Sequence, residues 1–239
     1  MLSSMGPPPS CVRSAAPGRA ACGSRRQLQD YVNRFPRFLN EAVLRALPAG
    51  TCHADPRIEW LSPLESDHYR EYRNLPFLQH LGLEDSAGRL AAYWPRLGPC
   101  WDGLGLVRGL KASRRGILLL EAYSNVCEVE CLGCRASAAS MHLIFEAFRE
   151  TREWLGAEET PAWLGPLYQT ANRLAHLHFL RNRLGVPTWL VQVYFLNDPI
   201  GPESRADWLP VIAGVQARLG LRSRPPFTLD IFLPALNPE

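Results

Sequence analysis

The sequence predicts a mixed α/β fold in which helices cover a central sheet. Residues 188–196 form an uninterrupted stretch rich in β-branched and aromatic residues, which is typical of a strand. Residues 117–120 form a short apolar run after a glycine, which is typical of a strand buried on both faces. Stretches with helical spacing of apolar residues alternate with these strands, and that alternation indicates a sheet covered by helices.

The first two helices are expected ahead of the first strand. Apolar residues recur at helical spacing over 26–47, with a break or kink at Pro36, because proline cannot continue a helix. A second helix is expected over 62–81. Its start carries a serine, then a proline, then a glutamate three positions after the serine, and this order is typical of a helix N-terminus.

The remaining elements follow from apolar runs and from the glycines and prolines between them. They are strands at 104–107 and 117–121, helices at 135–155 and 167–184, a strand at 188–196, a helix at 206–219 and a strand at 227–233. We find no repeat and no interior linker. We therefore expect one domain at 27–239 after a flexible tail at 1–26.

Composition is that of a globular protein, with 239 residues, 46% of them hydrophobic and 21% charged. The 26 basic and 23 acidic residues give a net charge of +3, which neither requires nor excludes a nucleic-acid partner. Lys111 is the single lysine. No apolar stretch reaches the roughly 18 residues that a membrane-spanning helix needs, so we expect a cytoplasmic protein without a membrane segment.

The cysteines are odd in number and scattered. Seven cysteines without an export signal favour reduced thiols in the cytosol. Three of them, Cys127, Cys131 and Cys134, have the C-x3-C-x2-C spacing that holds a [4Fe–4S] cluster in radical S-adenosylmethionine enzymes. Unmetallated thiols, a zinc or iron–sulfur site, and a redox-labile pair all remain open for this cluster.

Two carboxylates lie at or beside the ends of neighbouring expected strands. Asp102 precedes the strand at 104–107, and Glu121 ends the strand at 117–121. Carboxylate oxygens are the ligands that Mg²⁺ and Mn²⁺ prefer, and such an ion polarises a phosphoryl oxygen. Acidic residues at strand ends are also common in proteins without a metal, so both readings stay open.

The arrangement resembles that of the PD-(D/E)XK nucleases. Trp101-Asp102, a hairpin-sized gap and an apolar strand ending in Glu121-Ala122-Tyr123 resemble the acid–strand–(D/E)XK pattern of that superfamily. Further motifs, which span about residue 58 to the C-terminus, resemble an uncharacterised bacterial family within it. They are Trp60-Leu61-Ser62-Pro63-Leu64, Glu71-Tyr72-Arg73, Trp94-Pro95, Gly98-Pro99, Cys134-Arg135-Ala136-Ser137, the run from Tyr168 to Ala175, and Tyr194-Phe195.

The resemblance implies a restriction-endonuclease-like αβββαβ core and metal-dependent hydrolysis of nucleic-acid phosphodiester bonds. Asp102 and Glu121 would be the metal ligands. Glu71, on the expected upstream helix, resembles the extra acidic ligand of some members. Glu128 is a further metal-site candidate, and Gln169 would orient the substrate.

Tyr123 stands where the superfamily pattern has lysine. A tyrosine hydroxyl donates a hydrogen bond but brings no positive charge to the transition state. Lys111 would replace that charge only if its loop folded back, and Arg114 or Arg135 could supply charge instead. The alternative is therefore a degenerate nuclease-fold protein that binds nucleic acid or a protein partner without cutting. An iron–sulfur or zinc protein built on the three clustered cysteines is a third hypothesis.

The expected helix at 167–184 carries a polar stripe. Gln169, Asn172, Arg173 and His176 lie within one or two adjacent turns. One interpretation is a solvated face with one core-facing histidine. The other is a stripe that faces the carboxylates and contacts substrate phosphates. The basic turn at 111–116, with Arg114, is a separate feature that would either bind a phosphate backbone or simply be exposed to solvent.

Overall fold

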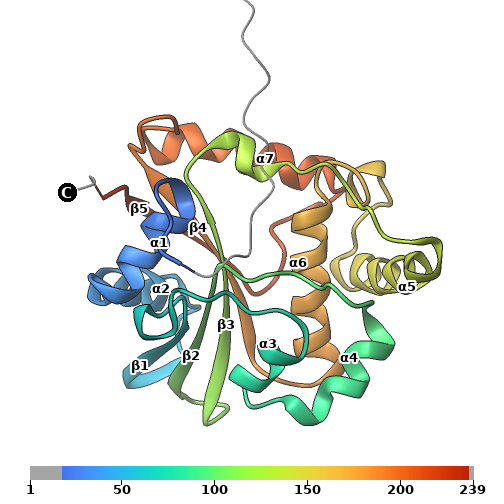
Figure 1. Cartoon of the computed structure of the whole chain (residues 1–239), viewed down its shortest axis with the longest axis horizontal. Coiled ribbons are helices and arrows are strands. Elements are labelled where there is room, and N and C mark those ends of the chain that lie inside the picture. Colours follow the sequence, from blue (N-terminus) through green and yellow to red (C-terminus); the bar gives the residue numbers. More distant parts are fainter. Residues whose placement is uncertain (1–17, 237–239) are drawn as a thin grey trace, which may run out of the picture.

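The computed structural model describes residues 18–236, in which five strands form one sheet in the order β1-β2-β3-β4-β5 (Figure 1). Neighbouring strands are antiparallel from β1 to β3 and parallel from β3 to β5. The strands are β1 (Cys52–Ser62), β2 (Gly103–Leu110), β3 (Arg115–Tyr123), β4 (Thr188–Leu196) and β5 (Thr228–Pro234). Because β4 and β5 run parallel to β3, the chain crosses over through helices before each of them.

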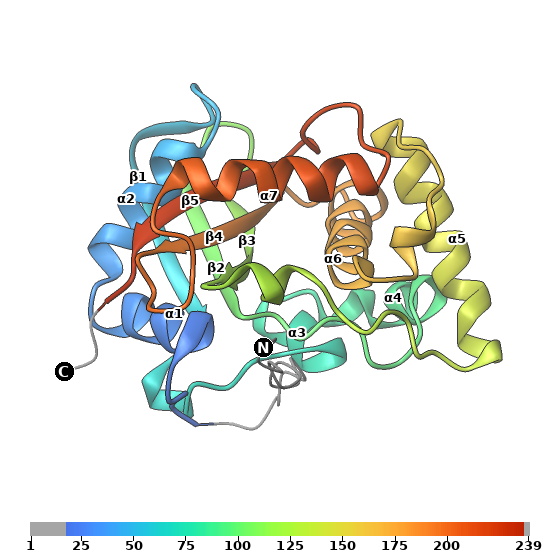
Figure 2. The ribbon, with the colours of Figure 1, turned by 90° about the horizontal axis from the view of Figure 1, so that it is seen from above.

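Helices cover both faces of the sheet. They are α1 (Gly23–Asn33), α2 (Pro36–Ala46), α3 (Asn74–His80), α4 (Ala87–Tyr93), α5 (Ala138–Leu155), α6 (Tyr168–His178) and α7 (Arg205–Arg218). Apolar residues of α1 and α2 form one core with the sheet, and those of α3 to α7 form the other. Figure 2 shows α1 and α2 on one side of the strands and α4, α5 and α6 on the other.

The alternation of side chains along β3 explains its apolar sequence. Leu118 and Leu120 belong to the core under α1 and α2, whereas Ile117 and Leu119 belong to the core under α3 to α7. Both faces of β3 are thus buried, as expected for a central strand with apolar residues at successive positions. The same alternation places Glu121 on the face that packs against α6.

Helix α1 is fixed to the segment that ends β5. The side chain of Gln27 donates to the carbonyl of Leu236 at 3.1 Å and accepts from the backbone N–H of Leu236 at 2.7 Å. The hydroxyl of Tyr31 donates to the carbonyl of Pro234 at 2.8 Å. The first helix and the last strand of the described chain are therefore held together directly.

The structure confirms a mixed α/β fold with a helix-covered central sheet. The strands expected at 104–107, 117–121 and 188–196 lie within β2, β3 and β4, and the one expected at 227–233 overlaps β5 but is shifted by one residue. Helix α2 begins at Pro36, where the break was expected. Among the described residues, no helix is both long and apolar enough to span a membrane.

The helix expected over 62–81 is wrong. Ser62 ends β1, a strand that the sequence did not predict, and a single 3-10 turn follows at Glu65–Asp67. His68 and Tyr69 then adopt positive φ values of 52° and 56°, which a continuing right-handed helix cannot include. Glu71 therefore lies in an extended segment before α3 and not on a helix.

The expected tail at 1–26 lies partly outside the described residues, because residues 1–17 are not described. Of the remainder, Gly23 begins α1, so the first helix starts three residues earlier than expected. The side chain of Gln29 accepts from the backbone N–H of Ala20 at 2.8 Å and donates to the carbonyl of Gly18 at 3.1 Å. These bonds hold the segment before α1 against the helix.

Candidate functional site

Three carboxylates open onto one cavity of about 180 Å³, which we call the carboxylate pocket. It lies where the first turn of α1 meets the end of the sheet at which β2 begins and β3 ends. Its lining residues are Cys22, Gly23, Ser24, Arg25, Glu71, Asp102 and Glu128. The structure thus brings together three of the four carboxylates expected at a metal site.

Asp102 is held in place by the backbone of β3. The residue is 4% exposed, and its Oδ2 accepts a hydrogen bond of 2.9 Å from the backbone N–H of Ala122. The register that pairs Gly103 with Leu120 places Asp102 beside Glu121, one position further along. The neighbouring strands therefore bring these two acids to one end of the sheet, as the sequence predicted.

Glu71 and Glu128 face the first turn of α1. Arg25 Nε lies 2.6 Å from Glu71 Oε1, and the Cys100 thiol lies 3.7 Å from Glu71 Oε2. Burial, followed by the charge of Glu71, raises the pKa of Cys100 to about 11. Glu128 Oε2 accepts from the backbone N–H of Ser124 at 2.8 Å. Arg25 and the positive end of the α1 dipole thus partly balance the pocket's negative charge.

Glu121 lies deeper than the carboxylate pocket and does not line it. It is 1% exposed, with Oε1 accepting from Gln169 Nε2 at 2.7 Å and Oε2 accepting from Arg173 Nε at 2.8 Å. Arg173 also donates to the carbonyl of Cys100 at 3.1 Å, and its guanidinium lies 5.6 Å from the ring centroid of Trp101. Two residues of the predicted polar stripe therefore face a carboxylate and bind it.

Tyr123 is buried in a row of aromatic rings across the sheet. Its ring stacks on that of Tyr194 with centroids 5.4 Å apart, and Tyr194 stacks on Phe232 at the same separation. The three residues are paired in register on β3, β4 and β5. Tyr123 does not line the carboxylate pocket, although its position on β3 is the one expected.

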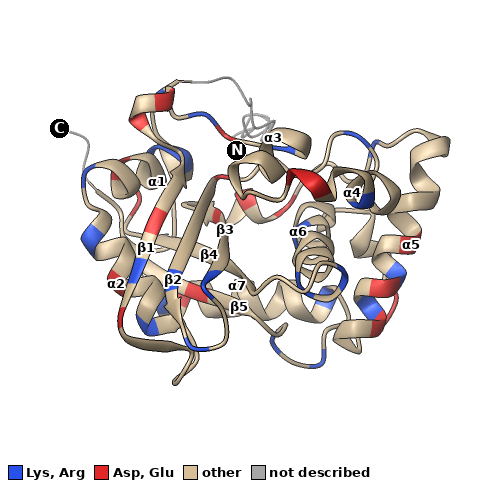
Figure 3. Cartoon of the chain, turned by 90° about the horizontal axis from the view of Figure 1, so that it is seen from below, with Lys and Arg blue, Asp and Glu red and all other residues tan. Residues whose placement is uncertain are grey.

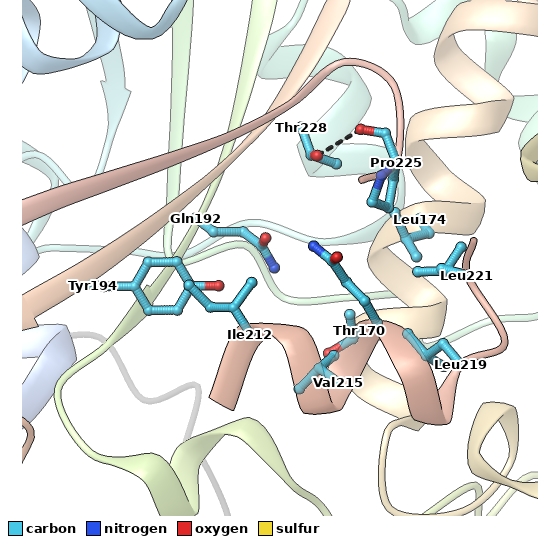
Figure 4. A pocket seen from close by; sticks show the side chains of 11 residues that line it. Thr170, Leu174, Gln192, Tyr194, Ile212, Val215, Leu219, Leu221, Pro225 and Thr228 are labelled. Carbon is cyan, nitrogen blue, oxygen red and sulfur yellow. Dashed lines mark hydrogen bonds between the residues drawn. The ribbon is translucent and has the colours of Figure 1, made fainter. Parts of the chain in front are cut away.

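A polar row runs beside the aromatic row, since the register pairs Glu121 with Gln192 and Gln192 with Asp230. Gln192 lines a cavity of about 30 Å³ between β4 and α7 (Figure 4). That volume suits one or two water molecules and no larger ligand. Burial raises the pKa of Asp230, although Arg224 lies 3.1 Å from it. The space on the Gln192 side of Glu121 is therefore too small for a substrate.

The other candidates for nucleic-acid contacts do not line the carboxylate pocket. Arg114 and Lys111 are exposed in the β2–β3 turn, at the opposite end of β3 from Glu121. Glu121 lies six positions after Arg115 along β3, which corresponds to about 20 Å. Arg135 is exposed just before α5. Asn172 is buried on α6, and its Oδ1 has no hydrogen-bond partner among the described residues.

Among residues 18–236, Arg25 is the one basic residue that lines the carboxylate pocket. Figure 3 shows basic positions on α2, α4 and α5, with acidic positions close to them. On α5, Arg149 contacts both Glu146 and Glu153 at 2.8 Å. A broad positive groove for a nucleic-acid backbone therefore does not follow from the described part of the chain.

The clustered cysteines do not line the carboxylate pocket. Cys127 is exposed on a 3-10 turn, whereas Cys131 and Cys134 are half-buried near residues 164–166. None of the six described cysteines forms a disulfide; Cys11 lies outside the described residues. Across residues 18–236, no three His, Cys, Asp or Glu side chains come close enough together to form a metal site.

Comparisons with models of protein families, with curated proteins and with solved structures found no match to this chain.

Proposed function

We propose that the carboxylate pocket hydrolyses phosphodiester bonds of a nucleic acid with the help of Mg²⁺ or Mn²⁺. The observation that carries the proposal is the convergence of Glu71, Asp102 and Glu128 on one cavity. The motifs shared with PD-(D/E)XK nucleases support it. So does the order of the elements, because a three-strand meander followed by helices and a parallel strand is compatible with an αβββαβ core.

The donors suit a hard divalent cation. Mg²⁺ keeps several waters and is commonly bound through one or two carboxylates, so it does not need three protein ligands in contact with one point. Asp102 with either Glu71 or Glu128 would hold it. When bound, such an ion polarises a phosphoryl oxygen and lowers the pKa of a bound water. Among the described lining residues, Cys22 is the one thiol and there is no imidazole, so zinc is the poorer fit.

Arg25 supplies the positive charge that Tyr123 does not. Its guanidinium lies at the pocket beside Glu71, within a first helical turn that presents backbone N–H groups. A phosphate that entered the pocket would meet this charge and the positive end of the α1 dipole. Gln169 and Arg173 act indirectly, because they hold Glu121 rigid behind Asp102.

A second function is favoured by the hydrogen bonds of Glu121. Both of its oxygens accept bonds from side chains on α6, and this arrangement balances its charge without a metal. Together with Tyr123 at the lysine position, it favours a nuclease-fold protein that binds nucleic acid or a protein partner without cutting it. In either case, we infer a cytoplasmic protein, because the described cysteines are not in disulfides.

The test measures Mn²⁺ and Mg²⁺ binding by calorimetry and cleavage of labelled single- and double-stranded DNA and RNA. Asp102→Asn is the variant of choice because its amide oxygen still accepts from the Ala122 N–H while the charge is lost. Glu128→Gln keeps an acceptor for Ser124 in the same way. We expect Asp102→Asn to weaken Mn²⁺ binding at least about tenfold and to abolish cleavage, since one charged ligand is removed. Glu128→Gln should have the same effect only if Glu128, and not Glu71, is the second ligand.

Asp55→Asn is the matched control. Asp55 is exposed on β1 beside Arg57, and its side chain does not line the pocket. Metal binding with no cleavage of any substrate would select the binding-only function. Absence of metal binding by the wild-type chain would overturn the hydrolytic proposal.

A further inference from the structure

A second cavity of about 290 Å³ lies between α3, α4 and α6, and we call it the His176 cavity. It is distinct from the carboxylate pocket, because the two share no lining residue within 18–236. Most of its wall is apolar. The lining residues are Asn74, Leu75, Pro76, Leu78, Ala87, Leu90, Ala91, Trp94, Pro95, Arg96, Gly98 and His176. Its volume is close to the smallest of typical ligand pockets and is many times that of one water.

The buried His176 side chain presents a hydrogen-bond acceptor to the cavity. His176 is 2% exposed, and its Nδ1 lies 3.0 Å from the carbonyl of Asn172. Because a carbonyl only accepts, Nδ1 carries the proton and Nε2 is left as an acceptor. Burial lowers the pKa of His176 to about 3, so the ring is neutral at physiological pH.

Glycine at position 98 leaves the space beside Nε2 open. A Cβ at Gly98 would lie 3.2 Å from His176 Nε2 and 3.4 Å from Asn74 Oδ1. Asn74 Oδ1 already accepts the Gly98 backbone N–H at 2.9 Å, so it too is an acceptor on this wall. Trp94 packs edge-to-face on the His176 ring, with centroids 5.0 Å apart, and holds it in place.

These features determine the charge and the hydrogen-bonding groups that a ligand of the cavity must have. Among the described residues, no acidic side chain lines the cavity, and Arg96, the one cation of that wall, is exposed. An apolar wall with a neutral acceptor stabilises a donor and leaves a buried anion without a partner. One imidazole nitrogen alone is also too few ligands for a metal ion.

We propose that the His176 cavity binds a small, uncharged ring compound whose N–H or O–H group donates a hydrogen bond to His176 Nε2. The ring would occupy the apolar part of the cavity. This proposal stands independently of the hydrolytic function, because it uses none of the residues of the carboxylate pocket.

The experiment compares indole with indene, its carbon isostere, which lacks the N–H donor. Binding to the full-length chain is measured by calorimetry or by ligand-observed NMR. One neutral hydrogen bond contributes about 1 kcal/mol, so we expect indole to bind about fivefold more tightly than indene. Gly98→Ala should remove that preference, since the new methyl group would crowd Nε2.

Two further variants keep the result interpretable. Gly88→Ala on α4 is the matched control, because its Cβ would meet nothing within 4 Å, and it should bind both probes like the wild type. His176→Phe retains a ring but removes the acceptor, so it should bind indene at least as well as indole even if Gly98→Ala folds poorly. Equal affinities of the wild type for both probes, or no binding of either, would overturn the proposal.

Discussion

The two ends of the β2–β3 pair carry charged residues in opposite environments. At the pocket end, the Arg173–Glu121 pair is buried, with side chains 7% and 1% exposed. Near the turn end, the Arg108–Glu59 pair has a similar separation of 2.6 Å, but both side chains are about half exposed. Since water screens the second pair and not the first, equal distances correspond to unequal free energies. Burial therefore decides which ion pairs at strand ends contribute strongly to the free energy of unfolding.

Removal of the buried cation should have the largest effect. Arg173→Met leaves the Glu121 carboxylate buried without its ion-pair partner, and breaking such a pair typically costs about 3–5 kcal/mol of unfolding free energy. Urea denaturation of the variant and the wild type measures the difference.

The double variant Arg173→Met/Glu121→Gln sharpens this prediction. It carries no unpaired charge, so it should be more stable than Arg173→Met alone. If Arg173→Met cost less than about 1 kcal/mol, the contrast between the two ends would fail.

The next largest loss of stability is expected at Gly116, which is closely packed near the β2–β3 turn. A Cβ at Gly116 would lie 2.5 Å from Trp189 Cζ3 and 2.8 Å from Leu110 Cδ1. Gly116→Ala should therefore lower the unfolding free energy by about 1–3 kcal/mol through overpacking. Thermal denaturation measures the loss, with Gly88→Ala as the control without a steric contact. An unchanged melting temperature would show that Trp189 moves aside freely.

The pH dependence of stability should reflect His176. Burial, with a smaller contribution from the charge of Arg173, lowers its pKa from 6.5 to about 3 in the folded chain. Below the unfolded pKa, the unfolded chain binds the proton and the folded chain does not. Its contribution is thus complete above pH 6.5 and is lost as the pH falls toward about 3, at up to about 1.4 kcal/mol per pH unit.

The check compares urea midpoints of the wild type and His176→Phe at about pH 7 and about pH 5. The wild type should lose more stability than the variant over this interval, because only the wild type carries the buried imidazole. Equal losses would mean that other groups, such as His178, account for the pH dependence.

The smallest effect is expected at the exposed pair. Arg108→Ala should change the unfolding free energy by less than about 1 kcal/mol, and the change should shrink further at high salt. Measurement at low and high ionic strength separates the charge from the packing of the arginine stem. A loss as large as that of Arg173→Met would remove the distinction between the two ends.

Elements with strong local patterns were predictable, and β1 was not. The strand at 188–196 is bounded as expected, because its β-branched and aromatic residues are buried on both faces. By contrast, β1 is an edge strand with mostly exposed or half-buried residues, so it lacks an apolar run. The helix signature at Ser62 misled because tertiary contacts placed that residue at the strand end.

The site was predictable where it depends on strand register. Adjacent strands bring Asp102 beside Glu121, and the spacing of Gln169 and Arg173 on α6 matches their joint contact with Glu121. Arg25 was missed, since its contact with Glu71 joins residues on separate elements and leaves no local pattern. The weakly apolar start of α1, rich in serine and arginine, resembled a tail.

The attachment of α1 to the segment after β5 has a practical consequence for preparing the protein. Gly23 and Arg25 line the pocket, and Gln27 and Tyr31, on the following turns, hold Leu236 and Pro234. The helix that lines the pocket is therefore hydrogen-bonded to residues more than 200 positions away in the sequence. An affinity tag fused at the carboxyl terminus would follow closely after these hydrogen bonds, so metal-binding and cleavage measurements should use cleavable tags or compare fusions at both ends.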